Sequence, residues 1–154
     1  MALVEICRAG DLEALKKLKY DGCEDLRAND NLALIIACEN GHLEIVKYLK
    51  KIGLTADDVT SNDNYALLAA CENGHLEIVK YLHQKFELTL DDARSNNNYA
   101  LQAACENDHL EIVKYLHQKF GLTVDDVRSN NNYAFQLACE NGHLQVAKYL
   151  YTEF

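Results

Sequence analysis

The 154-residue chain contains no proline, so one common helix breaker and one common turn former are absent. It also lacks a basic excess: 24 acidic residues against 15 basic ones give a net charge of −9, which repels nucleic acid and anionic membrane. No apolar run is long enough to span a bilayer. The first eight residues lack the basic and continuously apolar parts of a secretory signal. We therefore expect a partner that is neither nucleic acid nor membrane.

A stretch that recurs through the chain sets its organisation. Residues 71–82 read Cys-Glu-Asn-Gly-His-Leu-Glu-Ile-Val-Lys-Tyr-Leu, and similar stretches start at Cys38, Cys105 and Cys139, with a fainter copy from Cys7. Successive cysteines of this series are 31, 33, 34 and 34 residues apart. A period in this range, kept along the whole chain, indicates a stacked array in which each unit contacts only its neighbours. We expect a single domain over residues 1–154, made of units 1–31, 32–64, 65–98, 99–132 and 133–154.

Each unit reads as two helices. In the third unit, an alanine-rich run at residues 65–72 stops at Gly74, and Asn64 before it is expected to cap the first turn. The second helix, residues 76–86, carries an apolar stripe at helical spacing. The stripe consists of Leu76, Val79, Leu82 and Phe86.

The connectors between units share a polar pattern. In residues 54–62 a threonine, Thr55, is followed three residues later by Asp58, and residues 88–96 and 122–130 repeat this spacing. A threonine with a carboxylate three residues on is typical of a capping box at a helix start. We therefore predict a short helical turn in each connector instead of a pair of extended strands.

The run Asn-Gly-His-Leu-Glu-Ile-Val-Lys at residues 73–80 resembles the second helix of the ankyrin repeat. The resemblance covers nearly the whole chain, and it implies an all-α solenoid of five stacked helix pairs that binds proteins through loop tips and inner helices. The first helix departs from the family pattern, because Tyr-Ala-Leu-Leu at residues 65–68 stands where Thr-Pro-Leu-His is usual. The connectors resemble those of divergent ankyrin arrays from giant viruses and from bacteria living inside protists.

The repeated cysteines suggest a chemical environment for the chain. They occupy the same place in successive units, and helices stack about 8–10 Å apart. That separation exceeds the roughly 7 Å that a disulfide can bridge. We therefore expect reduced, packed thiols and a reducing, cytoplasmic location.

Histidines repeat four residues after the cysteines, at His42, His75, His109 and His143. A Cys–His pair could be a nucleophile with its base, or two metal ligands. Ladders spaced by a whole repeat cannot converge on one metal ion, and no third orienting group is evident. We therefore expect a structural role for these histidines, no catalytic residue, no metal and no cofactor, in a chain that is not an enzyme.

The function implied by the resemblance is a non-catalytic protein-interaction module, which we expect to be monomeric. The candidate contact residues lie on the connectors, at the ends of the first helices and at positions of the first helices that vary between units. They are Thr60, Arg94, Arg128, Ser61, Ser95, Ser129, Glu72, Asn73, Glu106, Asn107, Leu68, Gln102 and Gln136.

Two questions stay open at this point. The repeated tyrosines at the start of the first helices, Tyr65, Tyr99 and Tyr133, could either stack in the core or stand exposed as contact residues. The near-identity of residues 71–86 and 105–120 favours an alternative function, a structural or engineered consensus-like scaffold with no evolved partner.

Overall fold

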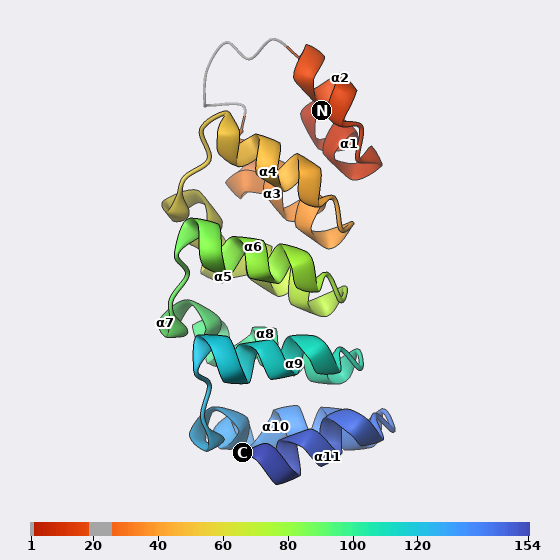
Figure 1. Ribbon diagram of the computed structural model, residues 1–154, viewed down its shortest axis with the longest axis vertical. Helices are drawn as coiled ribbons and strands as arrows, with labels where there is room; N and C mark the ends of the chain where they lie inside the picture. The colour runs from red at the N-terminus through yellow and green to blue at the C-terminus, as the bar shows by residue number, and fades with distance from the viewer. Residues whose placement is uncertain (1, 19–25) are drawn as a thin grey trace.

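The computed structural model describes residues 2–18 and 26–154, and within these ranges every regular element is a helix and no strand occurs. The helices form five pairs, which Figure 1 shows stacked along the long axis of the molecule with the connectors on one side. This confirms the predicted all-α solenoid. We call the first helix of each pair the inner helix and the second the outer helix. The inner helices are α1 (Ala2–Ala9), α3 (Ala28–Glu39), α5 (Ala56–Glu72), α8 (Ser95–Glu106) and α10 (Val124–Glu140). The outer helices are α2 (Leu12–Lys17), α4 (Leu43–Lys51), α6 (Leu76–Phe86), α9 (Leu110–Tyr115) with its π-helical continuation η1 (Leu116–Phe120), and α11 (Leu144–Glu153).

The core runs along the stack between the two layers of helices. Inner helices pack on one another in series, α1 on α3, α3 on α5, α5 on α8 and α8 on α10, and their many buried alanines allow close approach. The apolar stripe of α6 is buried at Val79, Leu82 and Phe86, joined by Ile78, whereas Leu76 is only partly buried. Full burial of a side chain of this size stabilises the fold by roughly 1.5–3 kcal/mol.

The connectors contain the predicted short helix. It is the separate element α7 (Leu90–Ala93) in one connector and the first part of α5 and α10 in two others. At α7 the carboxylate of Asp92 accepts a hydrogen bond from the backbone N–H of Thr89 at 2.7 Å, and the Thr89 hydroxyl accepts one from the Asp92 N–H. Thr55 forms the same reciprocal pair with Asp58, so the capping-box prediction is confirmed.

Left-handed backbone separates the short connector helix from the alanine-rich helical run that follows it. Residues 62–64 have φ angles of 52°, 54° and 60°, and the Asn/Asp triplets at 29–31, 96–98 and 130–132 adopt the same conformation. Asparagine and aspartate tolerate this region better than other non-glycine residues. The prediction that Asn64 caps the inner helix is wrong, because a capping residue needs extended backbone. Instead the Asn64 side chain is buried and its Oδ1 has no hydrogen-bond partner.

The histidine ladder joins each helix pair to the one before it. His75 Nε2 lies 2.9 Å from the backbone oxygen of Glu39, and the other histidines of the ladder make the equivalent contact at 2.8–3.0 Å. Glycine in the preceding turn leaves room for the ring, since a Cβ on Gly41 would lie 2.6 Å from His75. These histidines therefore have a structural role, as expected: each one connects its helix pair to the preceding pair.

The last helix pair leaves unused several groups that earlier pairs use in stacking. Arg128 and Asn132 are exposed, and nothing lies within 4 Å of the place where a Cβ on Gly142 would be. An apolar hollow of about 290 Å³ lies on the same face, lined in part by Phe135 and Phe154. The corresponding faces of α5 and α8 are covered by the next inner helix.

Candidate protein-interaction surface

The arginine candidates on the connectors have different environments. Arg94 pairs with Asp126 of the next connector through two hydrogen bonds, Nε to Oδ1 at 2.7 Å and Nη2 to Oδ2 at 2.9 Å. Burial by itself would raise the pKa of Asp126, but the hydrogen bonds from Arg94 and Thr123 outweigh it and hold that pKa below its ordinary value. Arg94 thus joins two units, whereas Arg128 is exposed.

Two of the four hydroxyl candidates on the connectors are engaged in hydrogen bonds inside the fold. Ser61 Oγ donates to the backbone oxygen of Asp58 at 2.8 Å and accepts from Asn31 Nδ2 at 2.9 Å. Ser129 makes the equivalent pair of bonds. Thr60 and Ser95 are partly exposed.

The candidates at the ends of the inner helices are the most accessible. Glu72 and Glu106 are exposed, and so are Asn73 and Asn107, which follow them. The side-chain amides of Asn73 and Asn107 each donate to a backbone oxygen four residues earlier, at 2.9 Å, and close the helix end. These four residues recur at the same place in neighbouring pairs, so they line up along the stack.

The variable positions of the inner helices lie deeper. Leu68 and Gln102 are buried, with relative exposures of 7 % and 5 %, and Gln102 Nε2 donates to the Asn97 backbone oxygen at 2.6 Å. Gln136 makes the equivalent bond to Asn131 at 2.9 Å but is exposed. The two buried side chains support the surface from below and do not form it.

A row of tyrosines belongs to this surface and was left out of the candidate residues. Tyr65, Tyr99 and Tyr133 are each 40–42 % exposed, so they stand at the surface and do not stack in the core. Their repetition directly after the Asn/Asp triplets of three successive units was the signal for them. Sequence could not say which way they point, because a tyrosine suits both a core and an interface.

The two layers of the solenoid differ sharply in charge. We define the inner-helix layer as residues 28–42, 61–75, 95–109 and 129–143; it holds seven acidic residues and no lysine or arginine. Acidic residues of the outer helices have cationic neighbours: Glu44 with Lys47, Glu77 with Lys80 and Glu111 with Lys114, at 2.6–2.7 Å. Within the described part of the chain, no such pair involves the glutamates of the inner-helix layer, which are Glu39, Glu72, Glu106 and Glu140. The negative charge of the molecule is therefore uncompensated on the inner layer.

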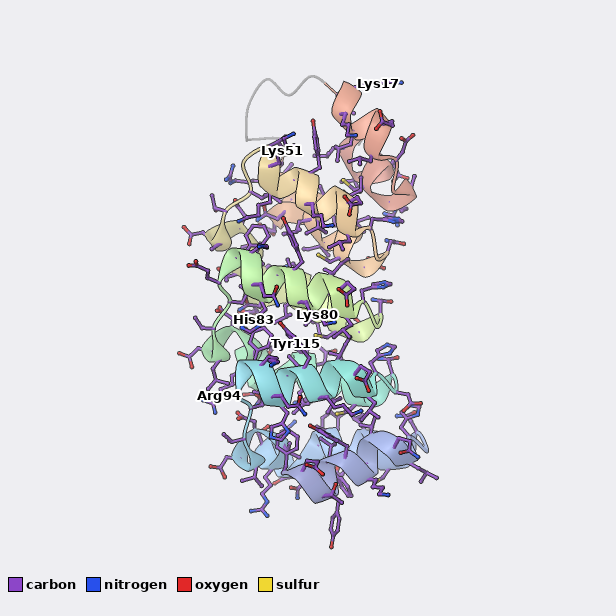
Figure 2. All side chains as sticks on the ribbon, in the orientation of Figure 1. Lys17, Lys51, Lys80, His83, Arg94 and Tyr115 are labelled. Atoms are coloured by element: carbon purple, nitrogen blue, oxygen red, sulfur yellow. The ribbon has the colours of Figure 1, made fainter. Side chains whose placement is uncertain are left out.

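Figure 2 shows a second kind of joint, between outer helices, which sequence reasoning missed. His83 on α6 points toward Tyr115 on α9, with Nδ1 3.0 Å from the phenol oxygen, and its ring stacks on Phe120 at 4.0 Å between centroids. Burial lowers the pKa of His83. His117 repeats the arrangement one pair later, against Tyr149. These rings hold the outer layer together.

The cysteines and histidines form no reactive centre in residues 2–18 and 26–154. Cys7, Cys38, Cys71 and Cys105 are buried free thiols, and burial raises the pKa of Cys7 to about 12. A thiol that stays protonated at neutral pH is a poor nucleophile and a poor metal ligand. In the same ranges, no group of three or more His, Cys, Asp or Glu side chains is placed to hold a metal ion.

Taken together, the fold and this surface define a class: a helical-repeat solenoid with an accessible inner layer and no catalytic constellation among its described residues. The family model for ankyrin repeats, which describes three copies of the repeat, matches residues 3–92 and again residues 69–153. The chain belongs to the ankyrin repeat family. Ankyrin repeats are in general non-catalytic protein-interaction modules. No curated protein shows significant similarity to the chain, and none of the described helices has the length and apolarity needed to cross a membrane.

Proposed function

We propose that this chain is a protein-interaction module that binds its partner through the inner-helix layer and the adjoining connector tips. The observation that carries this proposal is the line of exposed groups on that layer, Tyr65, Tyr99 and Tyr133 beside Glu72 and Glu106. Exposed aromatic side chains are enriched at the centres of protein interfaces. Of the sequence candidates, Glu72, Asn73, Glu106, Asn107, Gln136 and Arg128 form part of the proposed contact surface. The others, Thr60, Ser61, Ser95, Ser129, Arg94, Leu68 and Gln102, shape or support it.

A matched pair of double variants tests the proposal. Glu72→Gln with Glu106→Gln removes two charges from the inner layer, and Glu77→Gln with Glu111→Gln removes two charges from the outer helices of the same units. We expect the inner double variant to lower the affinity for the partner protein and the outer double variant to leave that affinity unchanged. Equal effects of the two variants would contradict binding through the inner layer.

The partner itself can be identified by photo-crosslinking in cells. A benzoylphenylalanine in place of Tyr99 should give a crosslinked product that excess unmodified chain competes away. The same group in place of Leu144, an exposed residue of α11, is the control and should give no such product.

The near-identity of residues 71–86 and 105–120 also supports a second candidate, a structural or engineered scaffold with no evolved partner. If neither crosslinking position yields a saturable product in any source cell tested, this second candidate is the better account of the chain.

A further inference from the structure

One of the capping-box aspartates lacks an ion pair that its counterparts have. Asp58 binds Arg27 of the preceding unit through both carboxylate oxygens, with Nη2 to Oδ2 at 2.7 Å. Asp126 binds Arg94 in the same bidentate manner. Asp92 stands at the equivalent place between them, but the residue that should reach it is Thr60.

Only one of the two carboxylate oxygens of Asp92 therefore accepts hydrogen bonds from the described residues. Its Oδ2 accepts hydrogen bonds from the N–H and the hydroxyl of Thr89, both at 2.7 Å. No cation among residues 2–18 and 26–154 pairs with it, and Oδ1 receives no hydrogen bond from them. Asp92 is also more exposed than Asp58 and Asp126, which are buried under their arginines.

Other acceptors and an aromatic ring surround this carboxylate. A small cleft of about 10 Å³, the room of one water molecule, is lined by Asp63, Asn64, Asp92, Ser95 and Tyr99. Asn64 is 92 % buried, and its Oδ1, like that of the equivalent Asn31 and Asn98, has no hydrogen-bond partner. Asn31 and Asn98 donate to the serine of the next connector, whereas no such bond joins Asn64 to Ser95. This joint therefore differs from the other two in the free Oδ1 of Asp92 and in the missing bond between its asparagine and serine.

We propose that Asp92, together with Asn64 and Tyr99, forms the binding site for an arginine side chain of the partner protein. The guanidinium takes the place, on Asp92, that the intramolecular arginine has on Asp58 and Asp126. Because the cleft holds only a water molecule, the head group lies at its mouth, between the carboxylate and the exposed ring of Tyr99. This inference rests on the proposed function, since it names the chemistry by which the inner-helix layer and the adjoining connector recognise a partner.

The geometry favours arginine over other cations. A planar guanidinium can donate to both carboxylate oxygens at once and can lie against an aromatic ring, whereas a lysine ammonium is a point charge. A calcium ion needs six to eight oxygen ligands, which this joint does not supply. The uncompensated acidity of the inner-helix layer would attract a basic segment and speed its encounter with the site.

The site can be tested with single amino-acid probes by two-dimensional NMR of the full-length protein. Acetyl-arginine amide should shift the backbone signals of Asn64, Asp92, Ser95 and Tyr99. Acetyl-citrulline amide has nearly the same shape without the charge and should bind at least about tenfold more weakly, because a charge-assisted pair is lost. Acetyl-lysine amide should fall between them.

Thr60→Arg is the decisive variant. It supplies the missing intramolecular arginine, so it should abolish the shifts caused by acetyl-arginine amide while keeping the fold. Gln145→Arg adds the same charge on an exposed position of α11 and should leave the shifts unchanged. Asp92→Asn should also abolish them, with circular dichroism confirming that the helices remain.

Three outcomes would overturn the site: equal binding of the citrulline and arginine probes, shifts spread evenly over the acidic layer, or unchanged shifts in Thr60→Arg. The crosslinking experiment separates these failures from failure of the proposed function. If Thr60→Arg still yields the saturable product through position 99, the inner layer binds a partner and only the arginine site is wrong.

Discussion

Replacing Asp108 by glycine should stabilise the joint between the last two helix pairs. Asp108 stands in the turn between α8 and α9, where the equivalent residues are Gly41, Gly74 and Gly142. Its φ is 62°, in the left-handed region, and its carboxylate lies 3.8 Å from the ring of His143. Glycine adopts this backbone without strain and leaves room for the ring.

The size of the gain follows from three contributions. A left-handed L-residue costs about 1–2 kcal/mol, and aspartate less. The greater freedom of glycine in the unfolded chain cancels about 0.4–1 kcal/mol of that gain. The lost contact of Asp108 with His143 is exposed and counts only when the histidine is protonated. We therefore expect the free energy of unfolding to rise by up to about 1 kcal/mol.

Urea denaturation followed by circular dichroism measures this change. With a slope of about 1–3 kcal/mol per molar urea, a gain of 1 kcal/mol moves the midpoint up by roughly 0.3–1 M. An unchanged or lower midpoint for Asp108→Gly would refute the reasoning.

Two glycine variants separate backbone strain from crowding. A Cβ on Gly74 would lie 2.6 Å from the ring of His109, whereas one on Gly142 would meet nothing within 4 Å. Both residues have positive φ, 79° and 75°. Gly142→Ala should therefore cost only the strain, about 1 kcal/mol, and Gly74→Ala should cost about 1–3 kcal/mol more. Equal costs would show that crowding by the histidine does not matter.

Three further predictions concern the connector, the outer-helix joint and the thiols. Thr89→Ala breaks a capping box and should lower the free energy of unfolding by about 1 kcal/mol, while Thr89→Ser should lower it much less; equal losses would argue against the hydroxyl bond. Burial lowers the pKa of His83 below its ordinary value of 6.5, so folding disfavours the protonated form of this side chain. The contribution of His83 to the free energy of unfolding should therefore be fully present above about pH 6.5 and should be lost as the pH falls below that value. His83→Phe should flatten that part of the urea-midpoint profile, and an unchanged profile would exclude His83 as its source. Iodoacetamide labelling read by peptide mass spectrometry should modify the exposed Cys139 well before the buried Cys71, and equal labelling of both would contradict the packed core.

Much of the fold was predictable because its information is local or periodic. The 31- to 34-residue period indicated stacking. The Thr-x-x-Asp spacing indicated a capping box, since both partners of that motif lie within one turn of chain. The burial of Cys7, Cys38, Cys71 and Cys105 and the unit-to-unit contacts of the His ladder also followed from repetition, because a residue kept in every unit is most simply part of the joint between units. Cys139 is exposed, so the expectation of a packed thiol is wrong there.

The left-handed Asn triplets were not predictable in the same way. An asparagine before an apolar run fits both a helix cap and a left-handed turn, and the choice depends on where the preceding short helix must lead the chain. At Asn64 the backbone is left-handed and continues the turn made by residues 62 and 63. The residue that caps a helix in this unit is Thr55, which precedes the short connector helix.

The candidate surface divides in the same manner. The sequence pointed to exposed glutamates at the inner-helix ends, because a polar residue directly after a buried run lies at a helix end. It could not show that Arg94 reaches Asp126, or that Asp92 has no such partner, since each pair joins residues about one repeat apart. Gln102 and Leu68 varied between units, but variation alone does not reveal burial.

The amino-acid sequence by itself determined the repeat, the helix pairs, the capped connectors and the net negative charge. Counted along the chain, that charge is nearly even from unit to unit. Only the tertiary structure decided that it is uneven across the solenoid, because stacking places every inner helix on one side and every lysine-bearing outer helix on the other. A periodic sequence specifies which residues are equivalent, whereas the three-dimensional stack specifies which of them share a surface.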